Sequence, residues 1–140
     1  MLDLVVLESK LMRKKEIEYL TEDYSALVLN KKARAELLRK FPPKFSKVIA
    51  HHVTIKFNVS KDVPLPKNAV VQVVGYATDN KGIEAAVVSV NGKIQRADGS
   101  NYHVTLSLEP GRKPAESNAI VQDYLPVQPF TLECKGEILK

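Results

Sequence analysis

Cysteine and histidine are scarce in this chain of 140 residues, which holds one cysteine and three histidines. The single cysteine, Cys134, excludes an intrachain disulfide, and we interpret it as a small buried hydrophobic residue in the last strand. A zinc site needs three or four ligands on one side. The only pool is His51, His52, His103 and Cys134, and strand alternation separates His51 from His52. We therefore expect no metal and no cofactor.

Glycine-rich nucleotide motifs and long apolar runs are also absent. There is no P-loop, no G-x-G-x-x-G and no G-x-S-x-G, so the chain shows no sign of kinase, nucleotide-sealing or serine-hydrolase chemistry. The apolar run near the N-terminus is interrupted by Asp3 and Glu8, and basic residues follow it rather than precede it. That order does not match a signal peptide, and the run is too short to cross a membrane. We expect a soluble, cytoplasmic protein.

The charge balance favours anionic partners without naming one. The formal net charge is +5, which favours phosphates or nucleic acid. No block of lysines or arginines and no arginine-rich helix narrows the choice. The length predicts one domain, which we place at residues 24–140, after an N-terminal segment (residues 1–23) to which no role is assigned.

Short apolar stretches separated by turn residues predict an α+β fold, with mostly antiparallel strands and helices outside. Asn30 is a good N-cap, and Pro42 and Pro43 end the helix that follows it. The expected strands cover residues 24–30, 47–59, 69–79, 83–90, 102–109 and 129–139, and the expected helices cover 31–41 and 119–125. Residues 1–23 permit either a strand or a helix.

The three histidines fall in two copies of one phrase, "AHHVTIKF" at residues 50–57 and "NYHVTLSL" at 101–108. In a strand, successive side chains point to opposite faces. In the first copy His52, Thr54 and Lys56 then share a polar face. His51 falls on the apolar face, where we expect a structural histidine whose ring finds a partner near the end of the strand.

The second copy repeats this arrangement, with His103 and Thr105 on the polar face. Two imidazoles and two hydroxyls across a groove suit attack on a phosphodiester. One histidine takes a proton from the nucleophile and the other gives one to the leaving oxygen, because both protonation states of histidine exist near neutral pH. The threonines would donate hydrogen bonds to the phosphate oxygens, and no metal is needed.

The phrases H-V-T-I from His52 and H-V-T-L from His103 resemble the paired His-x-Thr/Ser-x signature of the 2H phosphoesterase superfamily, the two-histidine phosphodiesterases. The resemblance covers residues 24–140. The second motif strand and its flank, "YHVTLSLEPGRKPAESN", look most like the cyclic phosphodiesterase domains of RNA-repair and tRNA-ligase systems. It implies a bilobal α+β domain with internal pseudo-twofold symmetry. In that fold the motifs lie on central strands that face one cleft.

The resemblance also implies an activity, the metal-independent cleavage of 2′,3′-cyclic phosphates or related 2′-linked phosphodiesters on RNA or nucleotides. Carried onto this chain, His103 would be the general base and His52 the general acid, with Thr54 and Thr105 on the phosphate. The residues themselves do not distinguish the two histidine roles.

Several further residues are candidates for substrate binding. Lys56 lies one step beyond the first motif, and Arg112 and Lys113 follow the second in a basic loop, so each could meet a phosphate or an RNA backbone. A solvated loop is the alternative interpretation. Lys93 and Arg96 are interpreted as surface charge.

Two alternatives to RNA processing stay open. A 2H enzyme could instead degrade a signalling nucleotide, such as a cyclic dinucleotide or a 2′-5′ oligoadenylate, including in a viral counter-defence role. A binding module could hold RNA or nucleotides without turnover. Tyr76 and Tyr124 could stack on a base, although packing in the core or at its rim is the simpler expectation for both.

Overall fold

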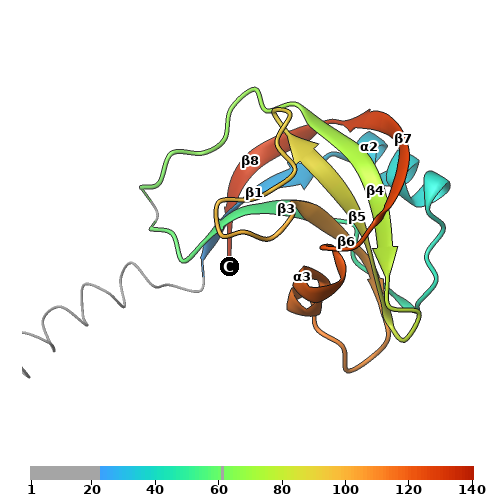
Figure 1. Ribbon diagram of the computed structural model, residues 1–140. Coiled ribbons are helices and arrows are strands. Elements are labelled where there is room, and N and C mark those ends of the chain that lie inside the picture. Colours follow the sequence, from blue (N-terminus) through green and yellow to red (C-terminus); the bar gives the residue numbers. More distant parts are fainter. Residues whose placement is uncertain (1–22, 61) are drawn as a thin grey trace, which may run out of the picture.

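The computed structural model describes residues 23–60 and 62–140 and has an α+β architecture with two antiparallel sheets (Figure 1). The three-stranded sheet has the order β3 (His52–Phe57), β1 (Tyr24–Leu29) and β8 (Cys134–Leu139). The five-stranded sheet has the order β2 (Lys47–Val48), β6 (His103–Leu108), β5 (Ile83–Val90), β4 (Val71–Thr78) and β7 (Leu125–Leu132). The helical elements are α2 (Lys31–Lys40), the 3-10 turn η1 (Pro114–Glu116) and α3 (Ser117–Ile120). The expectations for residues 1–22 lie outside the described residues.

Helix α2 forms where the sequence predicts it. The Asn30 side chain accepts a hydrogen bond from the Ala33 amide at 2.7 Å, as expected of an N-cap. Ala33 and Leu37 are buried one turn apart, and the helix ends at Lys40, just before the two prolines. The apolar side of α2 therefore packs on the core while its lysines and arginines face outward.

The strand expected over residues 47–59 is wrong as one unit, because the chain changes sheets inside it. The amides of Ile49 and Ala50 still donate to carbonyls of β6, whereas the next carbonyl, that of His51, accepts from Leu29 in β1 at 2.9 Å. Ala50 adopts a positive φ of 43° at this point, a conformation that non-glycine residues rarely take. The crossing divides the segment into β2 and β3.

The C-terminal part of the chain departs from expectation in the same way. Residues 129–139 form parts of two strands, because β7 pairs with β4 and β8 pairs with β1, with Glu133 between them. The helix expected over 119–125 is shorter and earlier: α3 ends at Ile120, and β7 already begins at Leu125. The chain therefore crosses between the two sheets twice in these segments, at Ala50 and at Glu133.

The core lies on both faces of β5, in which all eight residues are buried. Ala86 and Val88 join the larger cluster beneath α2, whereas Ala85 and Val87 join a smaller cluster beneath α3. Because successive strand residues point to opposite faces, α2 and α3 cover opposite faces of the five-stranded sheet. Thr105 of β6 lies on the face that looks toward α3, where its hydroxyl meets that of Ser117. None of the described helices is long and apolar enough to cross a membrane.

Candidate active site

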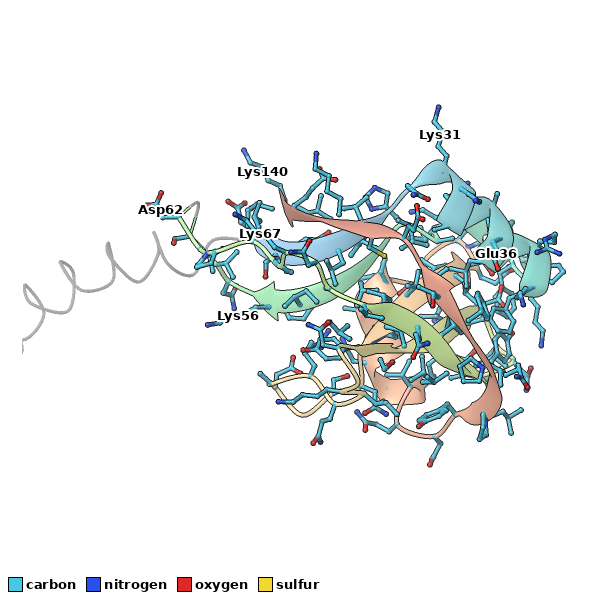
Figure 2. The ribbon with its side chains drawn as sticks, turned by 90° about the horizontal axis from the view of Figure 1, so that it is seen from above. Lys31, Glu36, Lys56, Asp62, Lys67 and Lys140 are labelled. Atoms are coloured by element: carbon cyan, nitrogen blue, oxygen red, sulfur yellow. The ribbon has the colours of Figure 1, made fainter. Side chains whose placement is uncertain are left out.

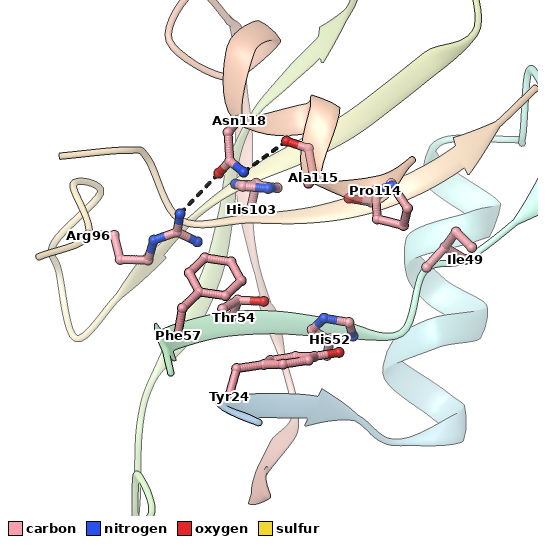
Figure 3. Close-up of a pocket in the computed structure, with 11 residues that line it drawn as sticks. Tyr24, Ile49, His52, Thr54, Phe57, Arg96, His103, Pro114, Ala115 and Asn118 are labelled. Atoms are coloured by element: carbon pink, nitrogen blue, oxygen red, sulfur yellow. Dashed lines mark hydrogen bonds between the residues drawn. The ribbon is translucent and has the colours of Figure 1, made fainter. Parts of the chain in front are cut away.

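A pocket of about 200 Å³ lies between β3 and β6, and both His-x-Thr pairs line it. His52 and Thr54 come from the three-stranded sheet and His103 and Thr105 from the five-stranded sheet, so the pocket spans the junction of the two sheets. Figure 3 shows His52 and His103 on opposite sides of the cavity. The remaining lining residues are Tyr24, Ile49, Phe57, Arg96, Pro114, Ala115 and Asn118.

On the β3 side, a β-bulge decides which side chains enter the pocket. Thr54 pairs with Ala26, but Lys56 pairs with Ser25, so Ile55 is an extra residue and the alternation reverses after it. Phe57, which the alternation places on the core face, therefore shares the side of Thr54 and lines the pocket. Lys56 is turned to the other side and points away from the fold (Figure 2). Its expected place beside Thr54 is corrected by the bulge.

On the β6 side, the motif residues are held by hydrogen bonds. His103 is only 9% exposed, and its Nδ1 lies 2.7 Å from the carbonyl oxygen of Asn101. A carbonyl oxygen only accepts hydrogen bonds, so Nδ1 carries the proton and Nε2 keeps the lone pair when the ring is neutral. The Thr105 hydroxyl lies 2.8 Å from the buried hydroxyl of Ser117 in α3. Ser117 is not among the residues that the sequence predicts for the site.

His51 does not occupy the apolar face expected for it. The residue lies before β3 begins, its side chain is exposed, and its Nδ1 is 3.0 Å from the Nδ1 of His52. The expected ring partner exists, but it is the neighbouring motif histidine. The positive φ of Ala50 and the sheet crossing remove the alternation that would separate the two rings.

Burial shifts the titration of both motif histidines. It lowers the pKa of His52 to about 4, helped by the positive charge that His51 and His103 carry when protonated. The pKa of His103 is lowered as well, first by burial and then by the Arg96 guanidinium, against the hydrogen bond to Asn101 that raises it. Burial therefore favours the neutral form of both imidazoles.

Arg96 lies in the pocket wall and is not the surface charge that the sequence indicates. It is 4% exposed; its Nε donates to Asp98 at 2.9 Å and its Nη2 to Asn118 at 3.0 Å (Figure 3). The guanidinium carbon lies 5.0 Å from the centre of the Phe57 ring. The local sign of these Arg96 contacts in the sequence is a carboxylate two residues away, in the loop "RADGSN".

The structure keeps the other basic candidates out of the pocket. Arg112 bonds Asp79 at 2.7 Å and Glu116 at 2.9 Å, and it also donates to the backbone of Lys81. Lys113 lies just before η1, and its amide donates to Glu116. The sequence predicts that both residues contact a phosphate. Instead, the contacts of Arg112 connect neighbouring loops. Neither residue is among the pocket's lining residues.

The two tyrosines considered for base stacking pack within the fold instead. The Tyr76 hydroxyl donates to the buried Glu84 at 2.6 Å, and its ring stacks on Phe41. Tyr124 lies so close over Gly75 that a Cβ there would clash with its ring. The aromatic residues at the pocket are Tyr24 and Phe57, which the sequence did not single out as ligand contacts.

The chemistry of the pocket rests on imidazole, hydroxyl and guanidinium groups. Among the described residues, no three side chains of His, Cys, Asp or Glu come together as a metal-binding group. Burial raises the pKa of the Cys134 thiol to about 11, so it is a poor nucleophile. The pocket can hold an oxyanion and exchange protons on two sides of it.

No protein-family model, curated protein or solved structure matches the chain.

Proposed function

We propose that this protein is a phosphodiesterase of the two-histidine type that opens 2′,3′-cyclic phosphates without a metal ion. One observation carries the proposal: the two copies of His-x-Thr, 51 residues apart in sequence, line one small pocket from two different sheets. If the two copies had no common role, they would not be expected to line the same pocket. Two sheets around one pocket also support the bilobal 2H fold, which we propose for residues 24–140.

His103 is the general base in this proposal. Its Nδ1–H is fixed on the Asn101 carbonyl, so Nε2 offers a lone pair to a nucleophile in the pocket. As the oxygen of water bonds to phosphorus, its proton passes to Nε2 of His103, and the Asn101 carbonyl stabilises the imidazolium that forms. A lowered pKa keeps His103 neutral and ready at pH 7.

His52 is the general acid, and it protonates the ribose oxygen as the bond from that oxygen to phosphorus breaks. Its pKa of about 4 leaves it uncharged at pH 7. A phosphate anion between the two imidazoles replaces like-charge repulsion with attraction and raises the pKa of His52. Bound substrate therefore favours a positive charge on this side of the pocket.

The remaining polar groups suit the phosphate oxygens. Thr54 offers its hydroxyl from β3, Thr105 offers its own through the pair with Ser117, and Arg96 offers its guanidinium from the wall. The cavity of about 200 Å³ is smaller than the ~300–1,000 Å³ of sites that enclose drug-sized ligands. It therefore encloses the cyclic phosphate and leaves the base at the rim, beside Tyr24 and Phe57.

The test is a turnover assay in EDTA on four substrates: a nucleoside 2′,3′-cyclic phosphate, a short RNA with a cyclic end, a 2′-5′ oligoadenylate and a cyclic dinucleotide. The intact protein is compared with His103→Ala and with Lys56→Ala, whose side chain points away from the pocket. We expect cleavage of the cyclic phosphates by the intact protein and Lys56→Ala, and not by His103→Ala. Cleavage of the third or fourth substrate alone would reassign the enzyme to a signalling nucleotide. Binding without turnover, equal in all three proteins, would make it a binding module.

A further inference from the structure

The acid half of the pocket lacks an obvious source of protons. Among the described residues no carboxylate lines it, and the groups around His52 that can carry a proton or a charge are His51 beside it, Tyr24 from β1, His103 from β6 and Arg96 from the loop before β6. The Arg96 guanidinium already donates to Asp98 and Asn118, His103 works as the base, and burial raises the pKa of Tyr24. Of these described groups, only His51 both contacts a ring nitrogen of His52 and has an exposed side chain.

The contact between the two histidines is specific in its atoms. Their Nδ1 atoms lie 3.0 Å apart and their rings meet edge to face at 78°. Two ring nitrogens at this distance share one proton, because one must donate and the other accept. When His51 donates, His52 holds its own proton on Nε2, the ring nitrogen that Nδ1 contact leaves free for the pocket.

The backbone builds this contact against the ordinary geometry of a strand. Neighbouring side chains in a strand point to opposite faces, yet these two rings meet. Ala50 is fully buried with a φ of 43°, and its amide is tied to β6 while His51 is tied to β1. Holding a non-glycine residue in this region costs free energy, and residues strained in this way cluster at functional sites.

We propose that His51 is the positioning partner of His52: it holds Nε2–H of His52 toward the pocket and supplies a proton to Nδ1 of His52 as that acid reacts. This inference rests on the proposed function. In the step, the His52 Nε2–H bond breaks as the bond from hydrogen to the leaving oxygen forms. At the same time the Nδ1–H bond of the His51 imidazolium breaks and an Nδ1–H bond forms on His52. Both rings end neutral, and a solvent proton restores the pair once product has left.

Two variants separate holding from proton supply. Asn at position 51 can donate an amide hydrogen bond to Nδ1 of His52 but cannot transfer a proton, whereas Ala can do neither. We expect His51→Ala and His51→Asn each to lower kcat on a nucleoside 2′,3′-cyclic phosphate by roughly 10-fold to 100-fold, at the lower end of general-acid effects. Added imidazole should restore His51→Ala and not His51→Asn. Lys47→Ala, in the same crossing segment, serves as the matched control and should keep the intact rate.

Nitrogen-15 NMR of the histidine rings provides a readout that does not depend on turnover. The intact protein and His51→Asn should show His52 with its proton on Nε2, and His51→Ala should show a mixture of tautomers and a changed titration midpoint for His52. Unchanged His52 signals in His51→Ala, or an unchanged kcat, would overturn the inference. If the intact protein cleaves no phosphodiester, the proposed function fails, and the NMR comparison still decides whether His51 holds His52.

Discussion

Strand β6 lies inside the five-stranded sheet, between β5 and β2, whereas β3 is an outer strand of the three-stranded sheet and pairs with β1. Both carry His-Val-Thr, but β6 buries every residue and fixes both polar side chains by hydrogen bonds. Strand β3 has a bulge after its threonine and a histidine contact at its start. The same motif is thus held by side-chain hydrogen bonds to its surroundings in β6 and by a histidine contact in β3.

The difference suits the two proposed roles, those of a general acid and a general base. A base gains from a fixed tautomer and a ready lone pair, which the Asn101 carbonyl gives His103. An acid must change its protonation state with the substrate, which suits His52, whose pKa is set by burial and by neighbouring imidazoles. The asymmetry of the pocket therefore arises from the strands' neighbours and not from the motif.

The largest expected effect follows from removing either histidine. His103→Ala and His52→Ala should each lower kcat by about 10²-fold to 10⁴-fold, the usual contribution of a positioned acid or base. Since the two act on one transition state, the double variant should lose little more than the worse single variant. Single-turnover rates measured for all three variants test this. A double variant whose loss equals the product of the single losses would mean that the histidines act independently.

The threonines break the comparison most clearly on stability. Thr105→Val leaves the buried Ser117 hydroxyl without its partner, which costs about 1–3 kcal/mol of unfolding free energy. Thr54 makes no hydrogen bond within the described residues, so Thr54→Val should change stability by no more than ~0.5 kcal/mol. Both variants should lose turnover. Urea denaturation measures the stability difference.

A control isolates the buried hydroxyl pair. Adding Ser117→Ala to Thr105→Val removes both partners, and such paired removal can be nearly neutral. The double variant should therefore regain most of the lost stability without regaining activity. Equal stability losses in Thr54→Val and Thr105→Val would contradict the distinction between the two strands, since only the threonine of β6 is held by a buried hydrogen bond.

Sequence patterns alone predicted much of this fold, and their failures have physical causes. Helix α2, the Asn30 cap and the alternation that puts Val104 and Leu106 in the core were predictable because they depend on neighbours along the chain. The sheet crossings at Ala50 and Glu133 were not, because continuous apolar stretches do not reveal a change of pairing partner.

The same limit applies to the pocket. Alternation placed His52, Thr54, His103 and Thr105 correctly on its lining, but it failed beyond the bulge at Ile55. Arg96 was missed because its burial depends on Asn118, 22 positions later. Residues that reach the pocket through long-range contacts carry no local periodic signal.

Acid should weaken the fold through the histidines. The unfolded pKa of histidine is about 6.5, and that of His52 in the folded protein is about 4. Between these values the unfolded chain binds more protons, so stability falls as pH drops from about 6.5 to about 4 and changes no further through this group below that. The shift corresponds to at most about 3 kcal/mol. His103 adds to the loss in the same direction.

Denaturation of the intact protein and of His52→Gln, measured between pH 7 and pH 4, tests the linkage. Glutamine does not titrate, so the variant should lose less stability over this range than the intact protein. The same pH slope in both proteins would show that His52 titrates normally in the folded state. The comparison of β3 with β6 would then lose its electrostatic part.

The smallest expected effect sets Arg96 against Lys56. Arg96→Lys gives up the planar fork that reaches Asp98 and Asn118 together, and we expect KM for a nucleoside 2′,3′-cyclic phosphate to rise by about 10-fold, the loss of one charge-assisted hydrogen bond. Lys56→Gln removes one positive charge from the outward side of the bulged strand, so KM should stay within about twofold at 0.15 M salt, where exposed charges are screened. Measuring both at 0.15 M and 0.02 M salt separates contact from long-range attraction. A KM that rises equally in both variants would mean that Lys56 contacts the substrate. It would contradict the conclusion that the bulge turns Lys56 away from the pocket.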